Sequence, residues 1–375
     1  MYIYENPGWP DFFYDANSIS PLLEQCHIEQ GKLLLKMNLL GLSEKEDKIL
    51  STITSDITKS SEIEGLILNK AQVRSSIARR LGIQRNGLIS SDRNTDAVVE
   101  MMIEATHNYE KPLTEERLFG WHACLFPTGY SGMYKIDVGK YRTNQMQVIS
   151  GALGQEKVHY EAPAPEKIKT EMNRFLEWIN GNPSDTRNSD SLIKSAVAHL
   201  WFLTIHPFDD GNGRIARTIS DMLLCRSDRT SARFYSMSSQ IEADKNSYYE
   251  ILEHTQKGGL DITEWVGWFL SCALKSINES SSQSDIVMRK YSYLQSIEDI
   301  PLNERQRLMI SRLLDGTWLG VLNTSKWAKI AKCSVDTALR DISDLIKKGI
   351  LEKESTSGGR STNYNLVETI RQTTQ

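Results

Sequence analysis

The sequence lacks any close pair of cysteines. Its five cysteines are scattered along 375 residues without a CxxC pair: Cys26, Cys124, Cys225, Cys272 and Cys333. This spacing is neither a disulfide framework nor a cysteine-based zinc site. It fits a reducing compartment, so we expect a cytoplasmic protein.

Long apolar stretches are also missing. No run approaches the roughly 18 to 20 apolar residues needed to span a bilayer. The first residues, MYIYENPGWPDFFYDA, contain Pro, Asp and Glu in place of the basic and apolar regions of a secretory signal. We therefore expect no membrane span and no leader.

An excess of one charge is absent as well. The formal net charge is -4 and the pI is about 6.0, so nucleic acid or an anionic membrane would need a local basic patch to bind. Hydrophobic residues make up 39% and charged residues 25%, as in folded soluble proteins. The length exceeds the size at which one core keeps growing, which predicts two or three domains.

Most of the chain has the spacing of apolar residues that is typical of helices. Helical patterns cover 19–81, with a capping-box signal from Ser43 to Glu46, then 95–126 with Thr114 as an N-cap, 166–179, 245–253 and 262–276. The segment Leu192 to Thr204 is nearly all apolar and too long for a typical strand. We interpret it as a buried central helix that leads directly to His206.

Two short β-type runs interrupt this pattern. Gln147 to Ile149 and Lys157 to Tyr160 flank a glycine-containing centre, Ser150 to Gln155, which predicts a β-hairpin. Further on, residues 277–290 are rich in Ser, Asn and Gln and resemble a domain junction.

The last part of the chain predicts three helices and a hairpin. The helices cover 303–314, 326–331 and 335–348, and the hairpin turns at Thr356 to Ser361 around Gly358-Gly359. This order is that of a winged helix-turn-helix. The predicted fold class is therefore mostly α, with an N-terminal helical region at 1–100, a catalytic core at 101–280 and a winged-helix domain at 290–375.

One segment concentrates chemically active residues. HPFDDGNGRIAR, from His206 to Arg217, follows the buried helix directly. Gly211 and Gly213 have no Cβ, so backbone N–H groups can converge on phosphate oxygens where the next helix begins. Taken singly, such residues also occur in turns and helix caps; their coincidence in this order favours a catalytic site.

The charged residues of this segment suit a polyphosphate. Arg214 and Arg217 are three apart, hence neighbours on one helix face, and guanidinium groups match phosphate oxygens. Asp210 is placed to hold a Mg²⁺ ion between phosphates. A histidine ordinarily titrates near neutral pH, so we expect His206 to be the natural acceptor of a hydroxyl proton.

HPFDDGNGRIAR resembles the Fic-family signature HPFx(D/E)GNGRxxR at every fixed position. The resemblance implies a mostly helical enzyme that transfers AMP from ATP to a Ser, Thr or Tyr hydroxyl of a protein. It makes His206 the base and Asp210 the Mg²⁺ ligand. It places ATP along Gly211, Asn212, Gly213, Arg214, Ile215, Ala216 and Arg217, with Asn212, Gly213 and Arg214 lining the anion hole.

Further features extend the resemblance. In the related Doc toxins, which phosphorylate their target, the position of Gly213 is typically lysine, so glycine favours AMP transfer. The hairpin at about 143–160 resembles the family's flap, which binds a target segment by strand addition. Tyr249, of the pair Tyr248-Tyr249, stands where relatives place an aromatic near adenine, although such a pair alone is also typical of core packing.

The N-terminal region contains a second motif. Ser60 and Glu64 are four apart on one face of a predicted helix, and Gly65 follows. They resemble the family's inhibitory motif (S/T)xxxE(G/N), whose glutamate pairs with the second arginine of the active site, here Arg217. The resemblance implies an autoinhibited enzyme; in related proteins this glutamate also orients water for AMP removal, and the sequence leaves that alternative open.

Two other functions remain open at this point. The same fold could transfer UMP or phosphocholine, because the motif recognises phosphates and not the base.

The winged helix could bind DNA. Asp336, Asp341 and Asp344 on its third helix disfavour contacts with phosphates, whereas Arg360 at the wing favours them. Protein recognition or a homodimer interface is the other use of this domain; relatives make a homodimer plausible.

Overall fold

The computed structural model describes residues 1–150, 157–181, 190–314, 320–354 and 362–367. The chain divides into two compact units, residues 1–280 and residues 281–375. Short two-stranded sheets accompany many helices, so the fold is mostly α, as predicted. None of the helices in the described ranges combines the length and apolar composition needed to cross a membrane.

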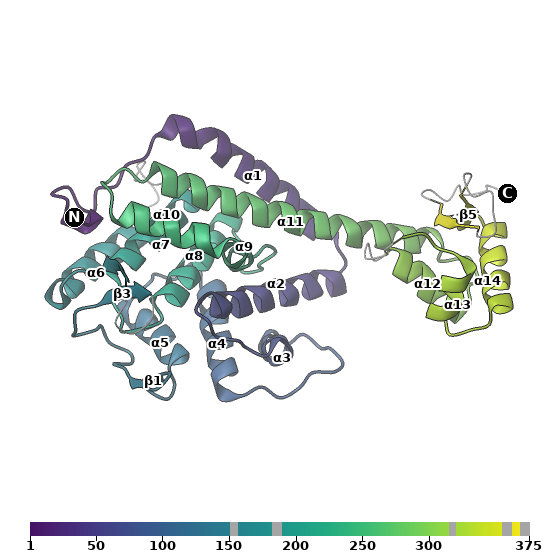
Figure 1. Ribbon diagram of the computed structural model, residues 1–375, viewed down its shortest axis with the longest axis horizontal. Coiled ribbons are helices and arrows are strands. Elements are labelled where there is room, and N and C mark those ends of the chain that lie inside the picture. Colours follow the sequence, from purple (N-terminus) through teal and green to yellow (C-terminus); the bar gives the residue numbers. More distant parts are fainter. Residues whose placement is uncertain (151–156, 182–189, 315–319, 355–361, 368–375) are drawn as a thin grey trace. The chain divides into compact units, whose positions relative to one another are not determined.

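Helices form most of the first unit (Figure 1). They are η1 (Ile3–Glu5), α1 (Ala16–Leu39), α2 (Leu42–Ile63), α3 (Lys70–Leu81), α4 (Arg93–His107), α5 (Glu115–Leu125), α6 (Pro165–Asn180), α7 (Ser191–Ile205), α8 (Asn212–Asp228), α9 (Met237–Ala243), α10 (Lys245–Gln256) and α11 (Thr263–Ser296). The predicted Thr114 cap is confirmed, because its side chain accepts a hydrogen bond from the Arg117 N–H.

Helices α7 and α8 form the centre of this unit. Thirteen residues of α7 are buried, from Leu192 to Ile205, which confirms the predicted central helix. Its N-cap is Asp190, whose carboxylate accepts from the N–H groups of Leu192 and Ile193. Helix α8 packs against α7 and is buried on most of its surface as well. The loop between them is therefore held between two core helices.

Within its described residues, the first unit contains two small antiparallel hairpins. Strand β1 (Tyr130–Ser131) pairs with β2 (Tyr134–Lys135), and β3 (Gln147–Ser150) pairs with β4 (Lys157–Glu161). The second hairpin is the one predicted from the sequence. Its predicted centre, Ser150 to Gln155, lies outside the described residues from position 151 onward.

One sequence-based expectation is wrong: the predicted cap at Ser43 is not used, because α2 begins at Leu42 with Gly41 as its N-cap. The predicted junction at 277–290 does contain the boundary between the two units. The segment is nevertheless helical, because α11 continues to Ser296 instead of ending near Ser276. Its small serines fit a packed face: Ser280 is buried and donates to the carbonyl of Phe234. Tertiary contacts thus override weak helix propensity there.

In its described residues, the second unit continues from the end of α11 into three further helices and a hairpin. They are α12 (Glu304–Leu314), α13 (Thr324–Ile330), α14 (Val335–Lys347), β5 (Leu351–Lys353) and β6 (Tyr364–Leu366). Trp327, Met309 and Ile342 form the centre of its core. The element order is the one expected, and the assignment as a winged helix stays a prediction. The wing tip with Gly358, Gly359 and Arg360 lies outside the described residues.

Candidate active site

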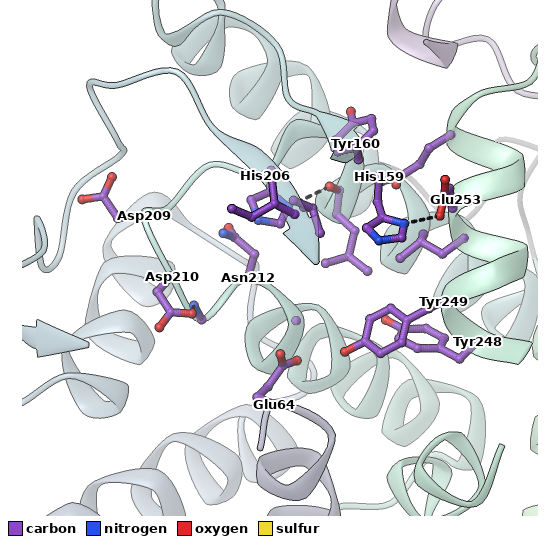
Figure 2. Close-up of a pocket in the computed structure, with 17 residues that line it drawn as sticks. Glu64, His159, Tyr160, His206, Asp209, Asp210, Asn212, Tyr248, Tyr249 and Glu253 are labelled. Carbon is purple, nitrogen blue, oxygen red and sulfur yellow. Dashed lines mark hydrogen bonds and ion pairs between the residues drawn. The ribbon is translucent and has the colours of Figure 1, made fainter. Parts of the chain in front are cut away.

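A pocket of about 440 Å³ opens beside the loop between α7 and α8. Figure 2 shows residues from four places around it: the end of α2, the β3–β4 hairpin, the loop with the start of α8, and α10. Its lining combines polar residues, such as His206 and Asp210, with aromatic and aliphatic residues, such as Tyr249 and Leu252. Such a pocket suits a ligand with a charged end and a flat apolar end.

His206 is held in a fixed orientation at the end of α7. It adopts a left-handed backbone conformation (φ 51°, ψ 60°), and its N–H donates to the carbonyl of Phe202 at 2.9 Å. Its Nδ1 lies 3.2 Å from the carbonyl oxygen of Leu203. Since a carbonyl can only accept, Nδ1 carries the proton and Nε2 is left as an acceptor.

Burial sets the charge of this imidazole. It lowers the pKa of His206 from 6.5 to about 4. The ring is therefore neutral at physiological pH and ready to take a proton on Nε2. A neutral, oriented imidazole of this kind is what a general base requires.

Two residues that sequence reasoning missed hold the backbone of this loop. The buried Arg142 donates from Nε to the carbonyl of His206 at 2.8 Å, and its N–H donates to the carbonyl of Pro207 at 2.9 Å. His122 stacks on Phe208 with ring centres 4.3 Å apart and bonds to the carbonyl of Asp210 at 3.2 Å. The loop is thus fixed from both sides.

Asn212 has a structural task within the motif. Its Oδ1 accepts from the Phe208 N–H at 3.0 Å, and its Nδ2 donates to the Phe208 carbonyl at 2.8 Å. Both ends of the amide are therefore occupied by one backbone residue. Because its side chain is occupied, Asn212 can contribute to the predicted anion hole only through its main-chain N–H.

The first turn of α8 points its free donors at the pocket. Gly211 is the N-cap with φ 79°, a conformation that side chains disfavour. The first helical hydrogen bond runs from Ile215 N–H to Gly211 C=O at 3.0 Å. The N–H groups of Asn212, Gly213 and Arg214 precede it and have no partner within the helix. Together with the helix dipole they form an anion site.

Arg214 adds a positive charge to this site. Its side chain is only 5% exposed, and its guanidinium lies 5.0 Å from the ring centre of Phe126. Its Nε is buried without a hydrogen-bond partner among the described residues. An unsatisfied buried guanidinium beside a set of free N–H groups fits an anionic ligand.

Arg217 contacts the end of α2. Its Nη2 lies 2.7 Å from Glu64 Oε1 and 3.0 Å from the carbonyl oxygen of Ser60, and its Nε donates to Ser60 Oγ at 2.8 Å. The ion pair predicted between Glu64 and Arg217 is thus present, and Ser60 supplies two further acceptors. Burial opposes the charge of Arg217, and Glu64 offsets this effect, so the pKa of Arg217 is raised.

Gly65 explains why α2 ends where it does. Gly65 is left-handed (φ 77°), its N–H donates to the carbonyl of Glu62 at 2.9 Å, and the Leu66 N–H donates to the carbonyl of Ser61 at 2.9 Å. These two bonds define a Schellman motif with glycine after the C-cap. The turn leaves Glu64 as the C-cap residue with its carboxylate over the pocket (Figure 2).

Glu64 lies directly over the anion site. A Cβ added to Gly213 would collide with Glu64 Oε1, so only glycine admits the carboxylate in this position. The negative side chain thus stands at the positive end of α8, next to Arg217. It occupies the place that an anionic ligand of α8 would take.

The two aspartates of the motif differ in their contacts. Asp210 accepts from the hydroxyl of Ser131 and from the Gly211 N–H, and it lines the pocket. Asp209 accepts from the N–H of Asp137 at 3.0 Å. No group of three or more His, Cys, Asp or Glu side chains gathers as a metal site within the described ranges. Asp209 also lines the pocket, and one or two such carboxylates plus phosphates are enough to bind Mg²⁺.

The remaining predicted site residues are split between pocket and core. Tyr248 and Tyr249 both line the pocket; Tyr249 is 39% exposed, whereas Tyr248 is buried and its hydroxyl bonds His199 at 2.9 Å. The side chains of Ile215 and Ala216 are fully buried and do not reach the pocket. Within the motif, these two residues serve the packing of α8.

A further pair, which no sequence signal indicated, closes one side of the pocket. His159 on β4 contacts Glu253 on α10, with Nδ1 and Oε2 2.5 Å apart (Figure 2). Glu253 also pairs with Lys257 at 2.6 Å. The hairpin is thereby attached to the helix that carries Tyr249. The two residues are 94 positions apart, so only the fold brings them together.

Family comparisons match two parts of the chain. Residues 112–224 match the Fic/DOC family, and residues 2–83 match a domain of unknown function (DUF4172). The first range contains α5, α6, α7 and most of α8, with the whole of His206 to Arg217. The second range contains Ser60, Glu64 and Gly65.

Curated relatives are similar over part of their length. Protein adenylyltransferase Fic of Nematostella vectensis is 23% identical over 224 residues, covering 59% of this chain and 47% of the relative. The protein of the same name in Drosophila mojavensis is 24% identical over 295 residues, covering 71% and 53%. The chain thus spans about half the length of the curated relatives it matches.

Solved structures share the fold. A Fic family protein from Desulfovibrio desulfuricans G20 matches with a TM-score of 0.55 at 19% identity, covering 96% of this chain and 98% of that chain. A Fic domain containing signaling protein from Bacteroides thetaiotaomicron VPI-5482 matches with a TM-score of 0.51 at 21% identity, covering 70% and 97%. Residues 112–224 of this chain are therefore similar to the Fic/DOC family, and the chain shares its fold with solved Fic proteins.

Proposed function

We propose that this protein transfers AMP from ATP to a Ser, Thr or Tyr hydroxyl of a protein, its own chain included. One observation carries the proposal: a neutral His206 with Nε2 available stands beside the free N–H groups and the buried arginine of the α8 N-terminus. A proton acceptor next to a phosphate site is the arrangement that nucleotidyl transfer to a hydroxyl needs. The names of the curated relatives support the same activity.

The reaction follows from this arrangement. His206 Nε2 takes the proton of the target hydroxyl while its oxygen attacks the α-phosphorus. The bond from that phosphorus to the bridging oxygen of the β-phosphate breaks, and pyrophosphate leaves. The N–H groups of Gly213 and Arg214 and the guanidinium of Arg214 stabilise the charge on the transferred phosphate.

The rest of the pocket suits the rest of ATP. Arg217, once separated from Glu64, would hold the terminal phosphate, and Tyr249 would stack on the adenine ring. Asp210 would hold Mg²⁺, which neutralises phosphate charge when bound. Glycine at position 213, where Doc toxins typically have lysine, favours transfer of AMP over transfer of a phosphoryl group.

The β3–β4 hairpin is proposed to bind the target. Ile149 and Val158 expose 55% and 39% of their surface, and strand addition needs a main-chain edge more than particular side chains. A target strand on this edge would place its hydroxyl near His206.

Autoinhibition by Glu64 is part of the proposal. Its carboxylate lies over Gly213 and engages Arg217, two groups that ATP needs. The resting protein would therefore bind ATP weakly or in an unproductive position. Removal of AMP with water oriented by Glu64 remains the alternative activity of the same site.

Automodification with labelled ATP tests the proposal. The Glu64→Gly variant is expected to label itself strongly, by an order of magnitude or more above the unchanged chain, because ATP gains Arg217 and the α8 N-terminus. His206→Ala in the Glu64→Gly background should abolish the label, and mass spectrometry should find one AMP per modified hydroxyl. A UMP or phosphocholine adduct with the matching donor, or a label that survives without His206, contradicts AMP transfer by this mechanism.

DNA binding by the second unit is the other candidate. The structure changes one argument against it: Asp341 is buried against Arg305 at 2.8 Å, and Asp344 pairs with Lys348 at 2.5 Å, so neither charge is free to repel phosphates. However, Val335 and Leu339 on the exposed face of α14 are apolar, which suits protein contact better. A salt-dependent gel shift with duplex DNA separates the two uses, and no retardation at low salt excludes DNA.

The homodimer and the cytoplasmic location also stay predictions. Light scattering tests whether the protein is a homodimer.

A further inference from the structure

Helix α10 presents one face to three other parts of the site. Lys245, Tyr249 and Glu253 are each four residues apart, so they lie in a row along the helix. Glu253 contacts the β3–β4 hairpin through His159, and Tyr249 lines the pocket. Lys245, the first residue of the row, reaches the end of α2. The row thus touches the hairpin, the pocket and the helix that carries Glu64.

The contact made by Lys245 completes the end of α2. Its ammonium donates to the carbonyl of Ile63, the last helical residue before Glu64. The Schellman bonds use the carbonyls of Ser61 and Glu62 and leave that of Ile63 without a backbone partner. A positive charge at the negative end of a helix dipole is also favourable. Lys245 therefore stabilises the turn from which Glu64 projects.

The same ammonium also contacts the wall of the pocket. It lies 5.8 Å from the ring centre of Tyr249, within the range of a cation–π interaction. In Figure 2, Tyr249 and Glu64 enter the pocket from two different helices. Lys245 thus contacts both the end of α2 and the Tyr249 ring on α10.

Other contacts show that α2 rests on the segment around α9 and the start of α10. Ser236 donates to Asp56 at 2.5 Å, and Lys59 pairs with Glu242 at 3.2 Å. Of these contacts, that of Lys245 stands nearest to Glu64 along α2. It is the one placed to fix the position of the inhibitory carboxylate.

We propose that Lys245 is a positioning residue that holds Glu64 over the anion site and links it to the base-binding wall at Tyr249. This inference rests on the proposed function. A base that stacks on Tyr249 competes with Lys245 for the ring, which weakens the hold on Ile63 and favours release of Glu64. The nucleotide would thereby help to open the site that it occupies.

The first test is labelling with ATP in two backgrounds. In the chain with Glu64, Lys245→Met should raise automodification about tenfold, since a charged hydrogen bond and a cation–π contact are lost, whereas Lys245→Arg should stay near the unchanged chain. In the Glu64→Gly background, Lys245→Met should change the rate little. Lys32→Met, which removes a surface ion pair with Glu29 on α1, is the matched control. No increase with Lys245→Met, or the same increase in both backgrounds, overturns the proposal.

The second test does not depend on activity. Hydrogen exchange in peptides covering residues 58–66 should be faster in Lys245→Met than in the unchanged protein, with Lys245→Arg restoring protection. Titration with ATP in the His206→Ala chain, which prevents turnover, should show tighter binding when Lys245→Met is added. If Glu64→Gly fails to label while exchange still responds to Lys245, the proposed function fails and the positioning role stands. Exchange that is unchanged in Lys245→Met refutes that role.

Discussion

The carboxylate of Glu64 occupies the space that a side chain on residue 213 would need. A methyl group on residue 213 would collide with Glu64 Oε1, which Arg217 holds in place. We predict that Gly213→Ala lowers the free energy of unfolding by about 1–3 kcal/mol in the chain with Glu64, because the carboxylate must move. In the Glu64→Gly background the same change should be neutral or stabilising, since alanine is the better helix former by up to about 1 kcal/mol.

Urea unfolding of the four variants in a double-mutant cycle measures this coupling. The cycle needs no enzymatic assay, so it tests the geometry alone. An equal cost of Gly213→Ala in both backgrounds is incompatible with Glu64 lying over Gly213.

The charge state of His206 gives a second prediction at this scale. Burial lowers the pKa of His206 to about 4, against about 6.5 for an exposed histidine. Between these values the unfolded chain binds a proton that the folded chain does not, so this residue makes stability fall as the pH falls from about 6.5 to 4.

We predict that the His206 ring stays neutral, with the proton on Nδ1, down to pH 5 in nitrogen NMR spectra. The signal is assigned by its loss in His206→Asn, and protonation between pH 7 and 6 argues against the buried base.

Much of this site could be predicted from local sequence. The glycines, arginines and histidine of the motif carry a chemical pattern, and the pairing of Glu64 with Arg217 followed from the family resemblance. Arg142, His159 and Lys245 could not be predicted, because each acts through a backbone carbonyl or a partner from a distant segment. Ile215 and Ala216 show the converse: they stand inside the motif and serve the core.

At the scale of elements, the end of α2 decides where Glu64 points. Gly65 adopts φ 77°, a conformation that costs other residues about 1–2 kcal/mol. We predict that Gly65→Ala loosens the Schellman turn, raises automodification above that of the unchanged chain, and remains less active than Glu64→Gly. Labelling with ATP and thermal unfolding measure the two effects.

Gly87→Ala provides the control for this prediction. Gly87 has φ 78°, nearly the same backbone strain, and lies in the loop between α3 and α4. It should cost similar stability and leave the labelling rate unchanged. A rise in labelling with Gly87→Ala as well would mean that general loosening, and not the α2 turn, controls the enzyme.

The sequence predicted most helices correctly, because apolar spacing is a local property. It missed the continuation of α11 beyond Ser276, where serines replace the apolar pattern and the burial of Ser280 against Phe234 becomes visible only in the fold. It also misplaced the start of α2, where Gly41 serves as the cap and Ser43 does not. Both errors arise where a tertiary contact or backbone geometry overrides the local signal.

At the scale of the whole molecule, the candidate site belongs to one of two units. All residues of the candidate site come from residues 1–280, and α11 continues past that boundary to Ser296. We predict that a protein ending after Ser296 unfolds cooperatively and, with Glu64→Gly, keeps its automodification rate within about twofold. Calorimetry and labelling test this; loss of labelling in a folded truncated protein assigns the second unit a part in catalysis.

Under the proposed function, the pairing of Glu64 with Arg217 would make Glu64 a tethered competitor of ATP. Because it belongs to the same chain, its effective concentration does not change when the protein is diluted. If the anion site is open in about one molecule in a hundred, the apparent affinity for ATP is about a hundredfold weaker than that of the open form. The strength of this contact would then set the ATP concentration at which the protein begins to act.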